Sequence, residues 1–196
     1  MRKWKIILFS TVCIGVLMFA GVCLYQKVVI SGDDTEKEVI VIEGGLYPAY
    51  TFSEAIEEAV TIVYGRAVGK SATKAHQITY DDYSPLYEYY KEVSIEVIDI
   101  LKGNMDAATV ICLEFGGETE EAIYIEKSQE PIELGEEYIL FLNKHGAAIS
   151  PMALLKVNED VVLTEGKLVP ESDVSTFSTE VSVESYLNAI KAVLEE

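Results

Sequence analysis

The sequence predicts a mainly β domain with flanking helices, folded as a small closed barrel behind an N-terminal transmembrane helix. Between residues 60 and 169, short apolar runs alternate with turns rich in Gly and Asn, which is typical of antiparallel strands. One run changes its alternation phase, which indicates a bulged and bent strand. Helix signals stand at both ends of this region, and five or six bent strands favour a small OB-like barrel over a flat sandwich.

The chain begins with a basic segment and an apolar run. Residues 6–25 contain no Asp, Glu, Lys or Arg, and 20 helical residues span about 30 Å, the thickness of a bilayer's hydrocarbon core. Only Lys27 follows the run closely, whereas three basic residues precede it: Arg2, Lys3 and Lys5. The positive-inside rule therefore predicts a cytoplasmic N-terminus and an extracellular C-terminal part.

Residues 1–30 are predicted to be a basic N-terminus with a transmembrane anchor in the lipid bilayer, or a signal peptide. The uncleaved anchor in the cell membrane is favoured because no small-x-small cleavage site follows the apolar run; cleavage would make the protein secreted. Residues 31–50 are predicted to be an acidic linker. Residues 51–196 are one domain's worth of chain and form the predicted OB-like β domain with its C-terminal helix.

The domain opens with a helix signal and a strand. Thr51 and Glu54 have the spacing of a capping box, so a short helix is predicted to begin there. Residues 60–68 then alternate as a strand does, with Gly65 and Gly69 at predicted bends.

Three more strands are predicted before residue 144. Val93, Ile95 and Val97 alternate with polar residues, and then the phase flips, which predicts a β-bulge near Ile98. Residues 109–115 form the next predicted strand, and residues 136–143 are apolar on both faces, as is typical of a central strand.

The remaining residues predict a meander and a final helix. Strands are predicted at residues 152–157, 161–164 and 167–169, joined by tight turns. Ser182 is the predicted N-cap of a helix in which apolar residues recur at helical spacing.

Several of these segments resemble the netrin-module and tissue-inhibitor-of-metalloproteinase-like OB-fold family, as found in uncharacterised bacterial surface proteins. The matching segments are residues 59–67, residues 97–103 ending in Leu-Lys-Gly, and residues 134–142, which read Leu-Gly-Glu-Glu-Tyr-Ile-Leu-Phe-Leu. The resemblance implies the fold. It does not imply metalloprotease inhibition, because the family's inhibitors resemble one another in an N-terminal cysteine of the domain, and none opens this domain.

Composition restricts the partners of the exported part. All 33 acidic residues and 11 of the 15 Lys and Arg residues follow position 30, so that part carries a net charge of −22. Such a field repels nucleic acid and favours cations or basic partners. Cys112 is the one cysteine outside the apolar run and is predicted to be a small strand residue, and no cofactor motif is present.

The most unusual stretch holds five of the twelve tyrosines and is the predicted contact site for a partner: Tyr80, Tyr83, Tyr87, Tyr89 and Tyr90. Tyrosine supplies a large, amphipathic contact area at small entropic cost. The alternative interpretation is that Tyr87 and Tyr89 only begin the alternating pattern of a strand. His76 and His145 belong to no spaced motif and are predicted to be exposed loop residues.

The sequence therefore predicts a membrane-tethered, non-enzymatic module that binds a protein or polysaccharide outside a bacterial cell. Two alternatives stay open. One is a hydrolase of cell-envelope material that uses acidic residues such as Glu114 or Asp99, although no paired-carboxylate signature is present. The other is an acidic surface protein that binds cations.

Overall fold

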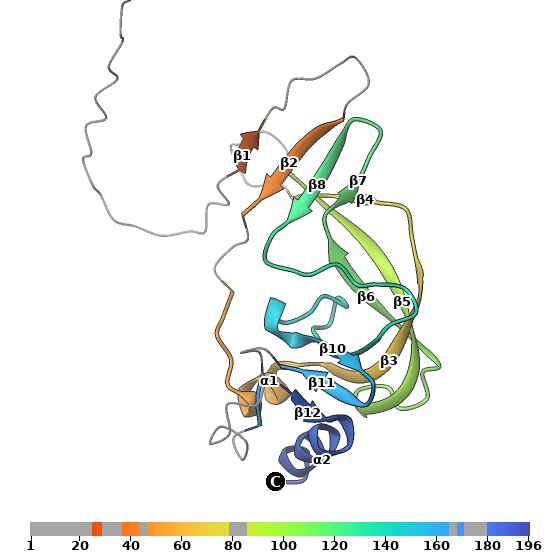
Figure 1. Cartoon of the computed structure of the whole chain (residues 1–196). Helices are drawn as coiled ribbons and strands as arrows, with labels where there is room; N and C mark the ends of the chain where they lie inside the picture. The colour runs from red at the N-terminus through yellow and green to blue at the C-terminus, as the bar shows by residue number, and fades with distance from the viewer. Residues whose placement is uncertain (1–24, 29–36, 44–46, 79–85, 165–167, 171–179) are drawn as a thin grey trace, which may run out of the picture.

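The computed structural model describes residues 25–28, 37–43, 47–78, 86–164, 168–170 and 180–196. The fold class is confirmed at the level of a mainly β domain with a few helices. The two α-helices lie at one end of the domain, and a small sheet lies at the other (Figure 1). Within the described ranges, no helix is long and apolar enough to cross a membrane. Residues 6–24 of the predicted anchor lie outside these ranges.

A large sheet forms the body of the domain. Its strand order is β12-β11-β10-β9-β3-β5-β4, and β6 pairs with the other edge of β5. The strands are β3 (Thr61–Lys70), β4 (Lys74–Ile78), β5 (Leu86–Lys102), β6 (Thr109–Phe115), β9 (Glu137–Leu142), β10 (Leu154–Asn158), β11 (Val161–Leu163) and β12 (Glu180–Ser182).

The predicted closed barrel is wrong, because neither sheet of the described residues closes. The edge of β6 that would meet another strand is met instead by the loop after β9. Only isolated bridges join Leu113 to Ala147 and Leu142 to Ala148. Two bridges hold the loop against β6 and β9 but do not make a ladder of strand hydrogen bonds.

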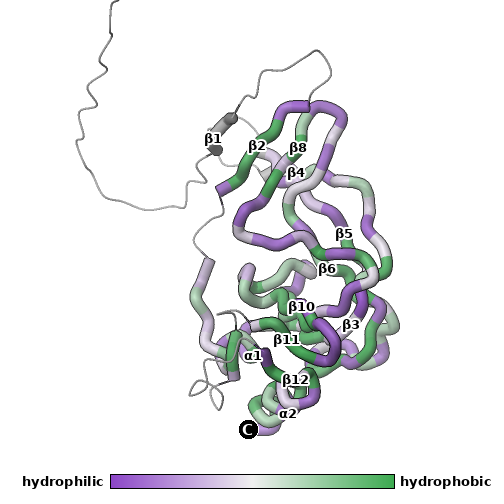
Figure 2. The backbone as a smooth tube through the Cα atoms, in the orientation of Figure 1, coloured by the Kyte–Doolittle hydropathy of each residue, from purple (hydrophilic) through white to green (hydrophobic). Residues whose placement is uncertain are grey.

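A second sheet contains segments that sequence patterns did not assign to strands. Its order is β1-β2-β8-β7, with β1 (Tyr25–Val28), β2 (Glu38–Ile42), β7 (Gly117–Glu118) and β8 (Ala122–Glu126). Strand β2 falls within residues 31–50, the predicted linker, and pairs in parallel with β8. Strands β2 and β8 are hydrophobic along much of their length (Figure 2).

The bulge in β5 is confirmed. Tyr64 pairs with Asp99 and Gly65 pairs with Val97, so that Ile98 has no partner residue in β3. The register of the same two strands shifts at two further places, where Leu101 of β5 and Val68 of β3 have no partner residue in the other strand. A Cβ atom at Gly65 would lie 2.5 Å from the carbonyl oxygen of Glu96, so this close approach of β3 to β5 requires glycine.

Helix α1 (Phe52–Glu58) has the predicted capping box. The Thr51 hydroxyl accepts a hydrogen bond from the Glu54 amide, and the Glu54 carboxylate accepts one from the Thr51 amide. At the other end of the helix, the Lys102 ammonium donates to the carbonyl oxygens of Ile56 and Glu57 at 2.8 and 2.9 Å. A cation at this position satisfies carbonyl groups that the helix leaves free.

The meander is confirmed only in part. Residues 151–153 form a short 3-10 helix, with Pro151 at its start, in place of the predicted strand beginning at 152. Residue 167 lies outside the described ranges, and residues 168–169 are not strand. The last helix, α2 (Val183–Leu194), begins as predicted, because the Ser182 hydroxyl accepts a hydrogen bond from the Ser185 amide.

Two apolar clusters form the core, one on each face of β9. Ile139 and Phe141 belong to the cluster beneath the two helices, whereas Tyr138, Leu140 and Leu142 belong to the cluster against β5 and β6. All five side chains are buried. The prediction of a central strand with two buried faces is therefore confirmed.

A candidate binding groove beside helix α2

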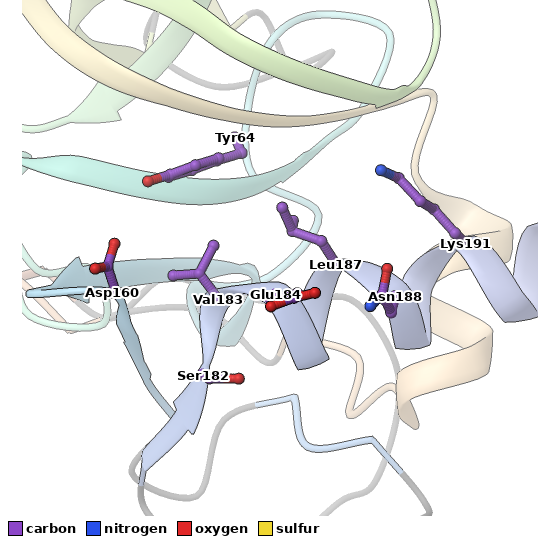
Figure 3. Close-up of a pocket in the computed structure, with 8 residues that line it drawn as sticks. All are labelled: Tyr64, Asp160, Ser182, Val183, Glu184, Leu187, Asn188 and Lys191. Carbon is purple, nitrogen blue, oxygen red and sulfur yellow. The ribbon is translucent and has the colours of Figure 1, made fainter.

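A groove of about 510 Å³ lies between strand β3 and helix α2. Tyr64 of β3 forms one wall, and the other wall comes from α2 and the residue before it (Figure 3). Asp160 stands at one end of the groove and Lys191 at the other, with Leu187 between them (Figure 3). The groove thus has polar ends and an apolar middle.

Local structure places each of these groups. Glu159 and Asp160 form the two-residue turn between β10 and β11 with φ angles of 47° and 66°, the geometry of a type I′ turn. The Asp160 carbonyl accepts a hydrogen bond from the Val183 amide, which joins this turn to the start of α2. Glu184, Asn188 and Lys191 then recur at helical spacing and line the same side of the groove.

Among the described residues, no cation pairs with the carboxylates of the groove. Asp160 and Glu184 are exposed, and neither side chain makes an ion pair or a hydrogen bond with another described residue. Lys191, the cation of the groove, is held by Asp99 at 3.2 Å. The groove therefore presents two carboxylates that no described cation pairs with, beside the half-buried side chain of Leu187.

A hydrogen-bonded chain fixes the tyrosine of the groove. The Tyr64 hydroxyl donates to one oxygen of Glu137, and the Arg66 guanidinium donates to the other at 2.5 Å. Burial, together with this hydrogen bond to a carboxylate, raises the pKa of Tyr64 to about 12. The phenol is therefore neutral at physiological pH, and its ring is held in one orientation at the edge of the groove.

Stability at acid pH depends on the same chain of groups. The Tyr64 hydroxyl, followed by the Arg66 guanidinium, lowers the pKa of Glu137 below its ordinary value. A carboxyl group with a lowered pKa in the folded state stabilises the protein above its unfolded pKa of about 4.3, and this contribution is lost as the pH falls through the folded pKa. Between pH 6 and pH 3, the free energy of unfolding of Glu137→Gln should fall less than that of the unchanged protein. Urea unfolding at the two pH values measures both changes. Equal losses would contradict this role.

The tyrosines of the predicted contact site fall into different environments. Tyr80 and Tyr83 lie outside the described residues. Tyr87 and Tyr89 lie on one face of β5, where Tyr89 stacks on Tyr124 with ring centroids 3.7 Å apart. Tyr90 lies on the opposite face. The three described tyrosines are strand residues and do not form one patch.

Tyr90 lines a second cavity, of about 500 Å³, together with both histidines of the chain. We call it the histidine cavity. The prediction for His145 is confirmed, because it is exposed in the loop after β9. The prediction for His76 is wrong in one respect: the residue is exposed but belongs to β4, a strand whose polar sequence, Lys-Ala-His-Gln-Ile, carries no clear alternation.

The remaining candidate residues have structural environments. Cys112 is fully buried in the core, and burial raises the pKa of its thiol to about 12, as suits the predicted strand residue. Glu114 is buried against Lys70. Among the described residues, no three His, Cys, Asp or Glu side chains are grouped so that they could hold a metal ion.

Sequence patterns did not single out the groove residues. Asp160 falls in a predicted turn, between residues 157 and 161, and Tyr64 falls in the predicted strand of residues 60–68. The sequence did contain one usable signal for a polar helix face, because polar residues recur at helical spacing in α2: Glu184, Asn188 and Lys191. The position of that face over β3 depends on the pairing of β11 with β12, two three-residue strands separated by residues 164–179.

No protein-family model, curated protein or solved structure matches this chain. Function is therefore inferred from the chemistry of its own residues.

Proposed function

We propose that this protein is a membrane-tethered, extracytoplasmic binding module without enzymatic activity, and that its α2 groove receives a basic side chain of a protein partner. The observation that carries the proposal is the pair of free carboxylates, Asp160 and Glu184, beside the half-buried side chain of Leu187. Lysine and arginine combine an apolar stem with a charged head. The stem would pack on Leu187 while the head reaches the carboxylates.

Arginine fits this groove better than lysine does. Its planar guanidinium offers five donors and pairs with carboxylates in two places at once, whereas an ammonium acts as a point charge. The wall also provides the face of Tyr64, on which a guanidinium can stack. The hydrogen bond to Glu137 keeps that ring in place, which lowers the entropic cost of binding.

The charge of the whole exported part supports the same class of partner. Its net charge of −22 attracts a basic surface over a distance and speeds the encounter. Because the groove carboxylates are exposed, added salt screens them, and binding weakens with ionic strength.

The family resemblance supports an OB-like fold for the domain. The path β6-β5-β3-β9-β10 contains five strands, and the isolated bridges at Ala147 and Ala148 draw β6 toward β9. An OB-fold is a five-stranded, partly open barrel. The three segments that resemble the netrin and tissue-inhibitor family fall in β3, at the end of β5 and in β9.

The membrane tether and the outward orientation of the domain are proposed from residues 1–27. A protease added to intact cells tests them, with an antibody against the last helix as the readout. The proposal expects the C-terminal part to be removed from intact cells and an intracellular control protein to be spared. A C-terminal part that survives until the cells are opened would contradict the proposed orientation.

The ion pairs of two other carboxylates favour binding over hydrolysis. Glu114 is paired with Lys70 at 2.7 Å, and Asp99 is paired with Lys191. These are the residues considered for a hydrolase, and both are engaged by cations. The two carboxylates also lie in different places, because Glu114 lies against β3 and Asp99 lies beneath α2.

Binding of a model peptide tests the groove directly. We expect acetyl-Gly-Arg-Gly-Arg-Gly-amide to bind the full chain at low salt, and Asp160→Asn and Glu184→Gln each to weaken binding about threefold to fivefold, since an exposed ion pair contributes up to about 1 kcal/mol. Calorimetric titration measures the affinities. The matched control is Glu120→Gln, which removes the same charge from the exposed turn between β7 and β8. A control that weakens binding equally would reduce the effect to net charge and contradict the proposal.

A further inference from the structure

The histidine cavity lies on the face of the large sheet formed by β4, β5 and β6. Strand register places His76 directly opposite Glu88, and Tyr90 directly opposite Phe115. Glu92, two residues beyond Tyr90, lies opposite Leu113. Side chains of neighbouring strands at paired positions point to the same face, so two aromatic rings lie side by side with a carboxylate on either side of Tyr90.

The loop after β9 closes one side of this cavity and is held rigidly. The Asn143 side chain accepts hydrogen bonds from the amides of His145 and Ala147, and the Gly146 carbonyl accepts one from the Leu113 amide at 2.9 Å. Gly146 has a φ angle of 83°, and a Cβ atom there would lie 2.7 Å from the Ile111 carbonyl oxygen. This loop geometry places His145 at the rim beside β6.

One of the two carboxylates of the cavity is engaged by a cation. Glu92 is paired with Lys74 at 2.6 Å. Burial raises the pKa of Glu88, and the nearby carboxylate of Glu126 acts in the same direction, against the opposing effect of His76. A strongly cationic ligand therefore gains less here than in the α2 groove, and the acidic field of the domain repels an anionic one.

We propose that the histidine cavity binds an uncharged saccharide. Tyr90 and Phe115 offer flat apolar surface to the C–H face of a sugar ring, as apolar ligand pockets do. The carboxylates accept hydrogen bonds, and the imidazoles and the tyrosine hydroxyl both donate and accept, which is the mixture that sugar hydroxyls require. A volume of about 500 Å³ lies within the range of small-ligand pockets, about 300–1,000 Å³. This site is separate from the α2 groove and stands whether or not that groove binds a basic partner.

Titration of the full chain with trisaccharides tests the proposal. The chain is kept in solution with a detergent that lacks a sugar headgroup, and the probes are the trimers of N-acetylglucosamine, of β-1,3-linked glucose and of mannose. Saturation-transfer NMR detects binding in the millimolar range and calorimetry measures tighter binding. A sulfated trisaccharide and the diamine putrescine represent anionic and cationic ligands.

The variants separate the cavity from the rest of the surface. We expect at least one neutral trimer to bind, and His76→Ala and His145→Ala each to weaken it about fivefold, the effect of one lost hydrogen bond. Both histidines are exposed, so these variants keep the fold. Lys144→Ala, an exposed neighbour of His145 that does not line the cavity, is the matched control and should change the affinity less than twofold. The proposal is overturned if no neutral trimer binds, if a charged probe binds more tightly, or if the control weakens binding as much as the histidine variants do.

Discussion

Replacing Glu114 with alanine should lower the free energy of unfolding by about 3–5 kcal/mol, the usual result of removing one partner from a buried ion pair. The Glu114 side chain is only 8% exposed, and its Oε2 atom accepts hydrogen bonds from the Lys70 ammonium at 2.7 Å and the Ile132 amide at 2.6 Å. Alanine leaves a partly buried cation and a buried amide without their acceptor. Both losses act on the cluster that joins β3, β6 and the segment before β9.

Glu114→Gln separates these two contributions. The amide oxygen of glutamine can still accept from the Ile132 amide, so this variant should lose less stability than the alanine variant. Urea unfolding followed by circular dichroism gives both values, provided that the slope with urea concentration is unchanged. A loss below about 1 kcal/mol for Glu114→Ala would mean that water replaces the lost partners and that this pair does not hold the strands together.

Tyr186→Ala is expected to have a similarly large effect, about 3–5 kcal/mol, because it removes a large aromatic side chain from the core. Tyr186 is 0% exposed. Its ring meets that of Phe52 edge to face with centroids 5.4 Å apart, and its hydroxyl donates to the Leu168 carbonyl at 2.7 Å. This one residue of α2 therefore joins both helices and the segment that follows β11.

Tyr186→Phe isolates the hydrogen bond from the packing. It keeps the ring but leaves the Leu168 carbonyl without its partner, so we expect a loss of about 1–3 kcal/mol. Thermal unfolding measures both variants, since about 1 kcal/mol shifts the midpoint by about 2–4 °C in a domain of this size. If the phenylalanine and alanine variants lost equal stability, the hydroxyl and not the ring would dominate, contrary to the packing of Tyr186 against Phe52.

Local signals in the sequence predicted the elements that local chemistry determines. The capping box at Thr51, the N-cap at Ser182 and the bulge at Ile98 each depend on residues within a few positions of one another. The apolar run of β9 was predictive because both of its faces are buried. The Leu-Lys-Gly segment has a structural explanation as well: Lys102 binds the end of α1, and Gly103 has a φ angle of 112°.

The small sheet and β4 were not predicted, because long-range pairing determines them. Strand β2 is acidic at its start and pairs in parallel with β8, about eighty residues later in the chain. Strand β4 is polar and exposed, since it lies at an edge of the large sheet. Barrel closure was predicted wrongly for the same reason: whether β6 meets a strand or a loop depends on contacts that alternation does not encode.

The candidate sites were harder to predict than the fold. Each site joins residues that are distant in sequence, as with Tyr64, Asp160 and Glu184 of the α2 groove. The clustered tyrosines were a visible compositional signal, yet alternation in β5 sends Tyr87 and Tyr90 to opposite faces. The two histidines showed no motif and nevertheless line one cavity.

The most direct test of the binding proposal is site-specific photo-crosslinking on living cells. A photoreactive amino acid at Asn188, which faces the α2 groove, should capture a protein with a basic surface, and Asp160→Asn in the same chain should reduce the yield (Figure 3). The same reagent at Glu120 should not capture that protein. The account is contradicted if Asn188 captures no partner, or if the partner is captured equally well from Glu120 or with Asp160 replaced.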